Sequence, residues 1–288
     1  MGYSGRYHAT SLIAVFLALA VGIVIGAALG GDTIDSTRKN LEQSLTGNLQ
    51  DARERADDLS GELGRANEFS SRVYPVLVRD QLSERRIGVL AFGDLPQDVL
   101  DSIEDALEPT GARLVGVGVV CEPVDTRALA EDLEKTRFAD LARNPDTQTA
   151  LGVGVGRQLV LGGTLLEPVR GHLFSRASGN FGALDGVIVV RDQPDDMGPQ
   201  QRATAGRFEA GLLTGITATR APAVGVETSD ADTSSVSFFV GNDLASVDDV
   251  DLAAGRLATV FALLGAEGSF GIKGSADRLL PDLLAPRE

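Results

Sequence analysis

Carboxylates are the side chains of this sequence that gather most densely where chemistry could occur. They cluster at Asp192–Asp196 and again at Asp248, Asp249 and Asp251. Such groups of hard oxygen ligands can hold Ca²⁺ or Mg²⁺, although neither spacing matches an EF-hand loop. Carboxylates also cap helices, and Asp251 directly precedes an apolar stretch, where an N-cap residue is expected. We therefore interpret the second cluster as a helix cap or a cation site, and favour the cap.

Residues suited to nucleophilic or metal-based catalysis are scarce. The chain has one cysteine, Cys121, and two histidines. A Ser-His-Asp or metal-histidine site in the bulk of the chain would depend on His172 alone. One cysteine cannot form an intrachain disulfide, which leaves a buried thiol or a Cys121–Cys121 bridge between two protomers. The residues themselves indicate no cofactor.

Glycine-rich stretches do not supply a phosphate-binding loop. The segment Phe92–Pro96 contains one glycine followed by an aspartate, unlike a dinucleotide-binding fingerprint. Three glycines alternate within Gly152–Arg157, but no strand precedes them, so we interpret this stretch as a helix that packs closely through glycine. The sequence also lacks a GxSxG, Walker or CxxC motif. We predict that the protein is not an enzyme.

The element that must position everything else is the uncharged run Ala9–Gly31. As a helix it would extend roughly 34 Å, enough to cross a hydrocarbon core of about 30 Å. The run is longer than a typical signal-peptide core, which favours a retained anchor. Small residues at Ala27–Gly30 leave a cleaved signal as the alternative.

Small residues recur every fourth position of this run and predict a stripe along which two helices could approach in lipid. The stripe comprises Ala14, Ala18, Gly22, Gly26 and Gly30.

Charges on the two sides of the run indicate its orientation. Arg6 and the α-amino group precede it, whereas Asp32 and Asp35 follow it. The positive-inside rule then places residues 1–8 in the cytoplasm and the remainder outside. We therefore expect a single-pass protein of the cell membrane or envelope, in contact with lipid.

Overall charge and a heptad pattern describe the region after the anchor. The formal charge of −15 disfavours nucleic acid as a partner. Across residues 36–80, Leu45, Ala52, Leu59, Ala66 and Val73 recur every seven residues, with Leu49, Ala56 and Leu63 between them. This pattern predicts a coiled-coil stalk and a parallel homodimer, with a solvated single helix as the alternative.

Residues 85–288 show the texture of an α/β domain. Short apolar runs predict strands at Arg86–Gly93, Arg113–Val120, Leu184–Val190 and Ala223–Glu227. Helical spacing predicts helices between and after them, at Pro96–Leu107, Thr126–Leu141, Gln148–Leu161, Pro199–Thr219 and Leu252–Leu264, while Ser235–Gly241 fits a short helix or an edge strand. The fold class expected is a three-layer Rossmann-like or flavodoxin-like α/β domain.

Two stretches also resemble a known family. The opening Tyr7–Gly22, with Tyr7-His8-Ala9 and Ser11-Leu12, and the segment Ser246–Asp251 followed by Gly255 and Arg256, resemble the actinobacterial copper transporter family MctB. The resemblance implies a cell-envelope protein with a role in copper transport, efflux and homeostasis, with copper as the implied metal.

Copper ligands are not evident in the residues. Cu(I) prefers thiolate and thioether ligands, and Cu(II) prefers imidazole. Beyond the membrane-proximal end the chain offers Cys121, His172 and Met197, which are widely separated in sequence. The alternative function is a non-enzymatic envelope scaffold that binds an unknown envelope partner and no metal.

Overall fold

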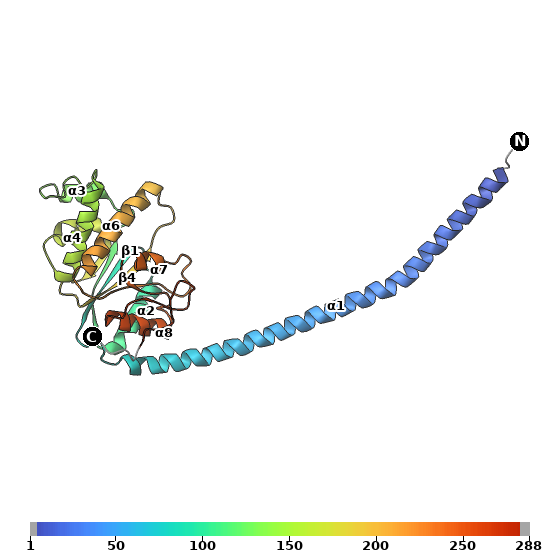
Figure 1. Cartoon of the computed structure of the whole chain (residues 1–288), viewed down its shortest axis with the longest axis horizontal. Coiled ribbons are helices and arrows are strands. Elements are labelled where there is room, and N and C mark those ends of the chain that lie inside the picture. The colour runs from blue at the N-terminus through green and yellow to red at the C-terminus, as the bar shows by residue number, and fades with distance from the viewer. Residues whose placement is uncertain (1–4, 283–288) are drawn as a thin grey trace. The chain divides into compact units, whose positions relative to one another are not determined.

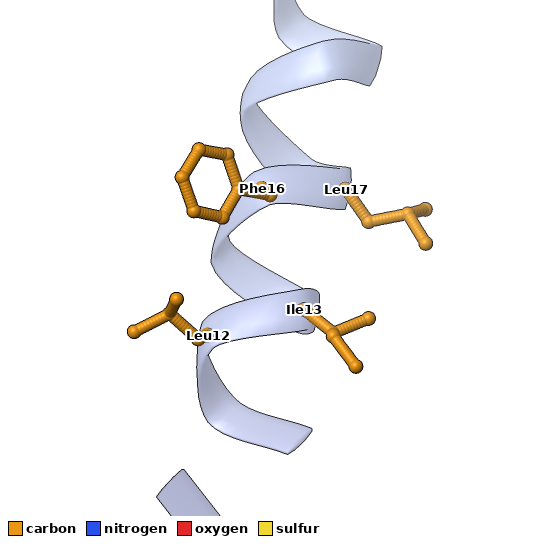
Figure 2. A pocket seen from close by; sticks show the side chains of 4 residues that line it. All are labelled: Leu12, Ile13, Phe16 and Leu17. Atoms are coloured by element: carbon orange, nitrogen blue, oxygen red, sulfur yellow. The ribbon is translucent and has the colours of Figure 1, made fainter. Parts of the chain in front are cut away.

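The structure is a computed structural model that describes the backbone of residues 5–282 and the side chains of residues 10–28 and 41–282. Its first element is the helix α1, Gly5–Val78, which contains the apolar stretch Thr10–Ala28. Figure 2 shows Leu12, Ile13, Phe16 and Leu17 projecting outward from successive turns of this helix, where they line a shallow open surface.

Among the described helices, this stretch of α1 alone is both long and apolar enough to cross a membrane by itself. The helices α4, Pro145–Leu161, and α5, Leu166–Leu173, meet the same criterion only as a pair bent by 110°. Both of these helices bury apolar side chains inside the α/β domain. The predicted N-terminal apolar helix is therefore confirmed.

The chain divides into two compact units, one up to Ala66 and one from Asn67 onward. The last turns of α1 belong to the second unit, where Tyr74 and Val78 are buried in the core. The Tyr74 hydroxyl donates a hydrogen bond of 2.5 Å to the carbonyl oxygen of Ala106. The α/β unit therefore incorporates the end of the long helix, upstream of residue 85.

The second unit is built on one seven-stranded sheet with the order β3-β2-β1-β4-β5-β6-β7. All neighbouring strands are parallel except β3, which runs antiparallel to β2 at one edge. This sheet confirms the predicted mixed α/β class. The strands are β1 (Arg86–Gly93), β2 (Arg113–Val120), β3 (Phe174–Gly179), β4 (Gly186–Asp192), β5 (Ala223–Val226), β6 (Ala245–Val247) and β7 (Ser269–Phe270).

Helices cover both faces of the sheet, with α2 and α8 on one side and α4 and α6 on the other (Figure 1). Two separate apolar clusters fill the layers between helices and sheet, and the end of α1 joins the cluster under α2 and α8. The remaining helices are α2 (Gln97–Leu107), η1 (Glu108–Thr110), α3 (Thr126–Asp132), α6 (Pro199–Thr217), α7 (Val236–Gly241) and α8 (Ala253–Leu263).

The helices α4 and α6 approach closely through glycine. A Cβ at Gly156 would overlap the carbonyl oxygen of Leu212 on α6, and a Cβ at Gly215 would overlap that of Val153 on α4. The interpretation of Gly152–Arg157 as a glycine-packed helix is therefore confirmed.

The helix predicted over Thr126–Leu141 is wrong in its second half, because α3 ends at Asp132. The Thr136 hydroxyl donates to the carbonyl oxygen of Leu133 at 2.8 Å and accepts from the Phe138 amide at 3.1 Å. These local hydrogen bonds replace those that would continue the helix. Leu133, Phe138 and Leu141 are nevertheless buried.

Several short elements were not predicted from the sequence: α5, the antiparallel edge strand β3, the strand β6 and the edge strand β7. The ambiguous segment Ser235–Gly241 forms the helix α7.

Candidate functional site: a buried polar network at the sheet edge

Charged side chains meet at the carboxyl-terminal ends of the parallel strands, which together form one edge of the sheet. Glu122 follows β2, Arg191 lies near the end of β4, Glu227 follows β5, and Asp248 and Asp249 follow β6. Open α/β sheets place their ligands at this edge. We call the connected charged groups described below the edge network.

Glu209 of α6 is the most enclosed acid in one half of the network, with only 1% of its surface exposed. Nε of Arg191 lies 3.1 Å from Oε1 of Glu209, and Nε2 of Gln193 donates to the same oxygen at 2.8 Å. The Arg191 guanidinium also lies over the ring of Phe238, 4.2 Å from its centroid. These contacts balance the buried charge of Glu209.

Glu122 adds a second carboxyl group beside this ion pair. Both of its carboxyl oxygens are buried, and neither has a hydrogen-bond partner of normal geometry among the described residues. Burial, and then the neighbouring Glu209 carboxylate, raise the pKa of Glu122 to about 9, although Arg191 and Gln193 oppose the shift. Burial and the neighbouring carboxylate thus favour the protonated form of Glu122.

Ser235, immediately before α7, connects the two halves of the network. Its amide donates to Oε2 of Glu227 at 2.6 Å, and its hydroxyl donates to the carbonyl oxygen of Arg191 at 3.3 Å. Nζ of Lys273 reaches Oε1 of Glu227 and the carbonyl oxygen of Thr228, each at 2.8 Å. A continuous polar path thus links the ends of β4 and β5 with the turn after β7.

Asp248 holds this C-terminal turn through backbone hydrogen bonds. Its Oδ1 accepts from the amides of Ile272 at 2.8 Å and Lys273 at 3.3 Å. A Cβ at Gly271 would overlap the Asp248 carboxylate, so the turn requires glycine there. Asp248 is completely buried by these contacts.

The expectation that Asp251 caps the following helix is wrong. The N-cap residue of α8 is Leu252, and no side chain caps this end. The Asp251 carboxylate instead accepts from the amide of Ser229 at 2.7 Å and from its hydroxyl at 2.6 Å. Asp251 does not cap α8 because its carboxylate is hydrogen-bonded to Ser229, and this contact connects the loop after β5 to the loop after β6.

Asp249 differs from its neighbours, because both of its carboxyl oxygens are buried and lack a hydrogen-bond partner among the described residues. Burial first, and then the charges of Asp248 and Asp251, raise the pKa of Asp249 to about 7, with Lys273 opposing them. Gly255 lies against it, and a Cβ there would overlap the Asp249 backbone.

Arg256, the next residue of the sequence motif, faces other partners. Its Nη2 lies 3.1 Å from Oδ2 of Asp105 and 3.4 Å from the carbonyl oxygen of Asp251. Its Nε is buried without a partner among the described residues. Arg256 thus links α8 to α2 and to the loop after β6.

Within the described part of the chain, no group of three or more histidine, cysteine, aspartate or glutamate side chains is arranged to hold a metal ion. Nδ1 of His172 lies 2.7 Å from Oδ2 of Asp132, and this contact raises the pKa of His172. Burial raises the pKa of the Cys121 thiol, and Met197 is buried. These soft donors follow β2, lie on α5 and precede α6, respectively.

The small-residue stripe lies on α1, where Ala14, Ala18, Gly22 and Gly26 occupy an exposed helix surface. A Cβ at Gly22 or Gly26 would meet no atom within 4 Å. The surroundings of Gly30 lie outside the described side chains.

Sequence reasoning missed the core of the edge network, including Glu122, Arg191, Glu209, Ser235 and Lys273. One signal was available for Glu209, which lies four residues after the buried Ala205 and four before the buried Leu213. A charge on the apolar face of a helix is unusual and indicates a buried partner. Lys273 offered no such signal, since it lies in a loop.

Comparison with known proteins covers nearly the whole chain. The family described as "Copper transport outer membrane protein, MctB" matches residues 3–281. The copper transporter MctB of Mycobacterium tuberculosis is 25% identical over 293 residues, covering 90% of this chain and 91% of the relative. The copper transporter MctB of Mycobacterium leprae is 25% identical over 312 residues, covering 93% and 95%, respectively. The match includes the apolar helix, the long helical segment and the α/β domain together, and the chain therefore belongs to the MctB family.

Proposed function

We propose that this protein is a single-pass component of the cell envelope that acts in copper transport and copper homeostasis. The observation that carries the proposal is the family match over residues 3–281, which includes both the membrane-compatible helix and the α/β domain. The relatives are named copper transporters. Deletion of the gene should increase cellular copper and lower the copper concentration that stops growth, and the intact chain should restore both. Unchanged copper content and tolerance would contradict the proposal.

The membrane arrangement we propose has the amino terminus in the cytoplasm and the α/β domain outside. It is supported by the apolar stretch Thr10–Ala28 and by the charges that flank it. Protease added to intact spheroplasts should digest the part of the chain after Asp32. Complete protection of that part would reverse the orientation. Amino-terminal sequencing of the mature protein distinguishes the retained anchor from a cleaved signal.

We further propose that two copies associate in parallel through α1. Leu45, Leu49, Leu59 and Leu63 of the heptad seam are each more than half exposed on the single helix. Asp57 and Asp58 lie off this seam, so the surface that would meet the partner is free of them. Both copies would be anchored in one membrane, which favours the parallel orientation and raises their effective concentration.

The copper role is expected to be exerted through an envelope partner, without a resident metal site. Copper prefers thiolate, thioether and imidazole ligands. The Cys121 thiol has a raised pKa and so is less available as thiolate, while one ring nitrogen of His172 is engaged by Asp132. A copper titration of the full-length protein should then show no stoichiometric tight binding.

The second candidate is an envelope scaffold, a non-enzymatic protein that binds a partner independently of copper. The edge network agrees with a protein that holds no metal, because its carboxylates are engaged by donors of this chain such as Ser229, Lys273 and Arg191. The two functions differ in one readout. Loss of a scaffold should alter envelope integrity without added copper, whereas loss of the copper function should appear only when copper is supplied.

A further inference from the structure

Asp249 is a fully buried carboxyl group that no described donor compensates. It follows β6 and precedes α8, its exposed fraction is zero, and both of its oxygens lack hydrogen-bond partners within the described chain. Gly255 packs closely against Asp249. A Cβ at Gly255 would lie 2.5 Å from Oδ1 of Asp249, so there is no space for another group between them. A charge on this carboxyl group could not be hydrated without local opening.

The charged groups around Asp249 come from every element that surrounds this end of β6. On its own loop, Asp248 and Asp251 are acids, and both accept hydrogen bonds from protein donors. From the turn after β7 comes Lys273, whose ammonium group is bound to Glu227. From α8 comes Arg256, which is paired with Asp105 of α2. Lys273 is therefore engaged by Glu227, Nη2 of Arg256 is engaged by Asp105, and the nearest acids oppose a charge on Asp249.

The segment held by the chain neighbour of Asp249 is the turn Gly271–Lys273. It follows β7, a two-residue strand at the edge of the sheet. The side chain of Ile272 is 56% exposed, so little apolar burial holds the turn. The amides of Ile272 and Lys273 are instead held by Asp248, the immediate chain neighbour of Asp249, and the Gly271 amide donates to the carbonyl oxygen of Arg278. Segments with few buried contacts and exposed positions open at low free-energy cost.

We propose that Asp249 is a proton-operated latch: its neutral form keeps the turn Gly271–Lys273 closed on Asp248, and its ionised form favours release of that turn. The ligand of this site is the proton itself, and the released element is the C-terminal turn that carries Lys273. Release would also withdraw the Lys273 ammonium from Glu227, which would expose the edge network to solvent.

The direction of the pH effect follows from the two states of the carboxyl group. In the closed state the pKa of Asp249 is raised to about 7, above the ordinary 3.8 that it regains once hydrated. Between these values the closed state binds a proton that the open state lacks, so opening increases as pH rises. The increase is at most about tenfold per pH unit, and it stops above pH 7, where both states are ionised.

Hydrogen exchange of the full-length protein in detergent micelles tests the latch. Peptides covering Ile272 and Lys273 are followed by mass spectrometry at pH 5, 6 and 7, with labelling times scaled for the intrinsic exchange rate. The wild-type protein should lose protection at these amides with each step, by up to about tenfold per pH unit. Equal protection at all three values would overturn the proposal.

Three variants separate the latch from general destabilisation. Asp249→Asn should keep the turn protected without dependence on pH, because its side chain cannot ionise. Asp248→Asn should weaken protection at every pH, because it replaces one of the two acceptor oxygens that hold the turn with a donor and removes the negative charge. Asp243→Asn, at an exposed position of the preceding loop, should retain the wild-type pH dependence. A wild-type pH dependence in Asp249→Asn would contradict the assignment, even if Asp248→Asn failed to fold.

Discussion

Nε of Arg191 lies 3.1 Å from Oε1 and 3.3 Å from Oε2 of Glu209, and thereby compensates a carboxylate that is 1% exposed. The two residues come from β4 and α6, so their ion pair joins the sheet to the helix layer above it. A buried pair of this kind is costly to break from one side, because the partner is left charged and unpaired.

Replacing this cation should therefore destabilise the α/β domain strongly. Arg191→Met removes the charge but keeps much of the apolar stem, and we expect a loss of about 3–5 kcal/mol in the free energy of unfolding. Circular dichroism of the full chain during urea unfolding measures it. The control is Arg113→Met, which breaks an exposed pair with Glu84 and should cost about 0–1 kcal/mol. Equal losses in the two variants would contradict the assigned role of Arg191.

Glu122 should make the domain less stable as pH rises. Its pKa is raised to about 9, above the ordinary 4.5, so the folded state holds a proton that the unfolded state releases between these values. Stability therefore falls with increasing pH in this window, by at most about 1.4 kcal/mol per pH unit, and the effect ends above pH 9.

Thermal unfolding of wild type and Glu122→Gln at pH 6, 7.5 and 9 tests this expectation. The variant cannot ionise, so its melting temperature should fall less than that of the wild type across the series. Glu134→Gln, at an exposed position, serves as the control and should follow the wild type. If all three proteins show the same slope, Glu122 is not the proton-binding group.

The contact between α4 and α6 should respond to a single methyl group. Gly156→Ala places a Cβ against the carbonyl oxygen of Leu212, and we expect overpacking to cost about 1–3 kcal/mol. Gly206→Ala, on α6 with open space around its Cβ, should instead stabilise by up to about 1 kcal/mol through helix propensity. Urea unfolding measures both changes. A stabilised Gly156→Ala would show that the two helices can separate without cost.

The small-residue stripe of α1 should control dimerisation of the protein if two copies meet along it. Combined Gly22→Leu and Gly26→Leu would separate the helix backbones, and we expect dimer dissociation to increase by at least about tenfold in detergent. Analytical ultracentrifugation in detergent measures the equilibrium. Val24→Leu, on the opposite side of the helix, is the matched control and should not change it. Unaltered association in the double variant would leave the stripe without a role in dimerisation.

Copper tolerance should survive loss of the soft donors if copper is handled through a partner. We expect a strain that expresses the combined Cys121→Ala, His172→Ala and Met197→Leu variant to grow in copper as the wild type does. Immunoblotting and circular dichroism establish that the variant is expressed and folded, which excludes loss of protein as a cause. Reduced tolerance with folded protein would restore direct copper binding by these side chains.

Local sequence determined the elements whose signals are contained within a few turns or one strand. The uncharged run Ala9–Gly31 predicted an apolar helix, because Thr10 and Ser11 are its only polar side chains, and Thr10–Ala28 forms such a helix. The strands Arg86–Gly93 and Arg113–Val120 have the predicted bounds, because each is a continuous apolar run in a buried parallel strand. The glycines of Gly152–Arg157 likewise indicated a close helix contact before its partner α6 was known.

Tertiary structure decided which charged residues meet. Glu122 and Glu209 are far apart in the chain, and they influence one another only because the residue after β2 and the middle of α6 come together in the fold. Asp251 was expected to cap the helix that follows it. In the fold, however, the hydroxyl of Ser229 lies close enough to donate a hydrogen bond to the Asp251 carboxylate. Lys273 showed no helical or strand pattern, and its role depends on the position of β7 at the sheet edge. Periodicity reports which side of an element is buried, whereas partners across loops depend on how the elements assemble.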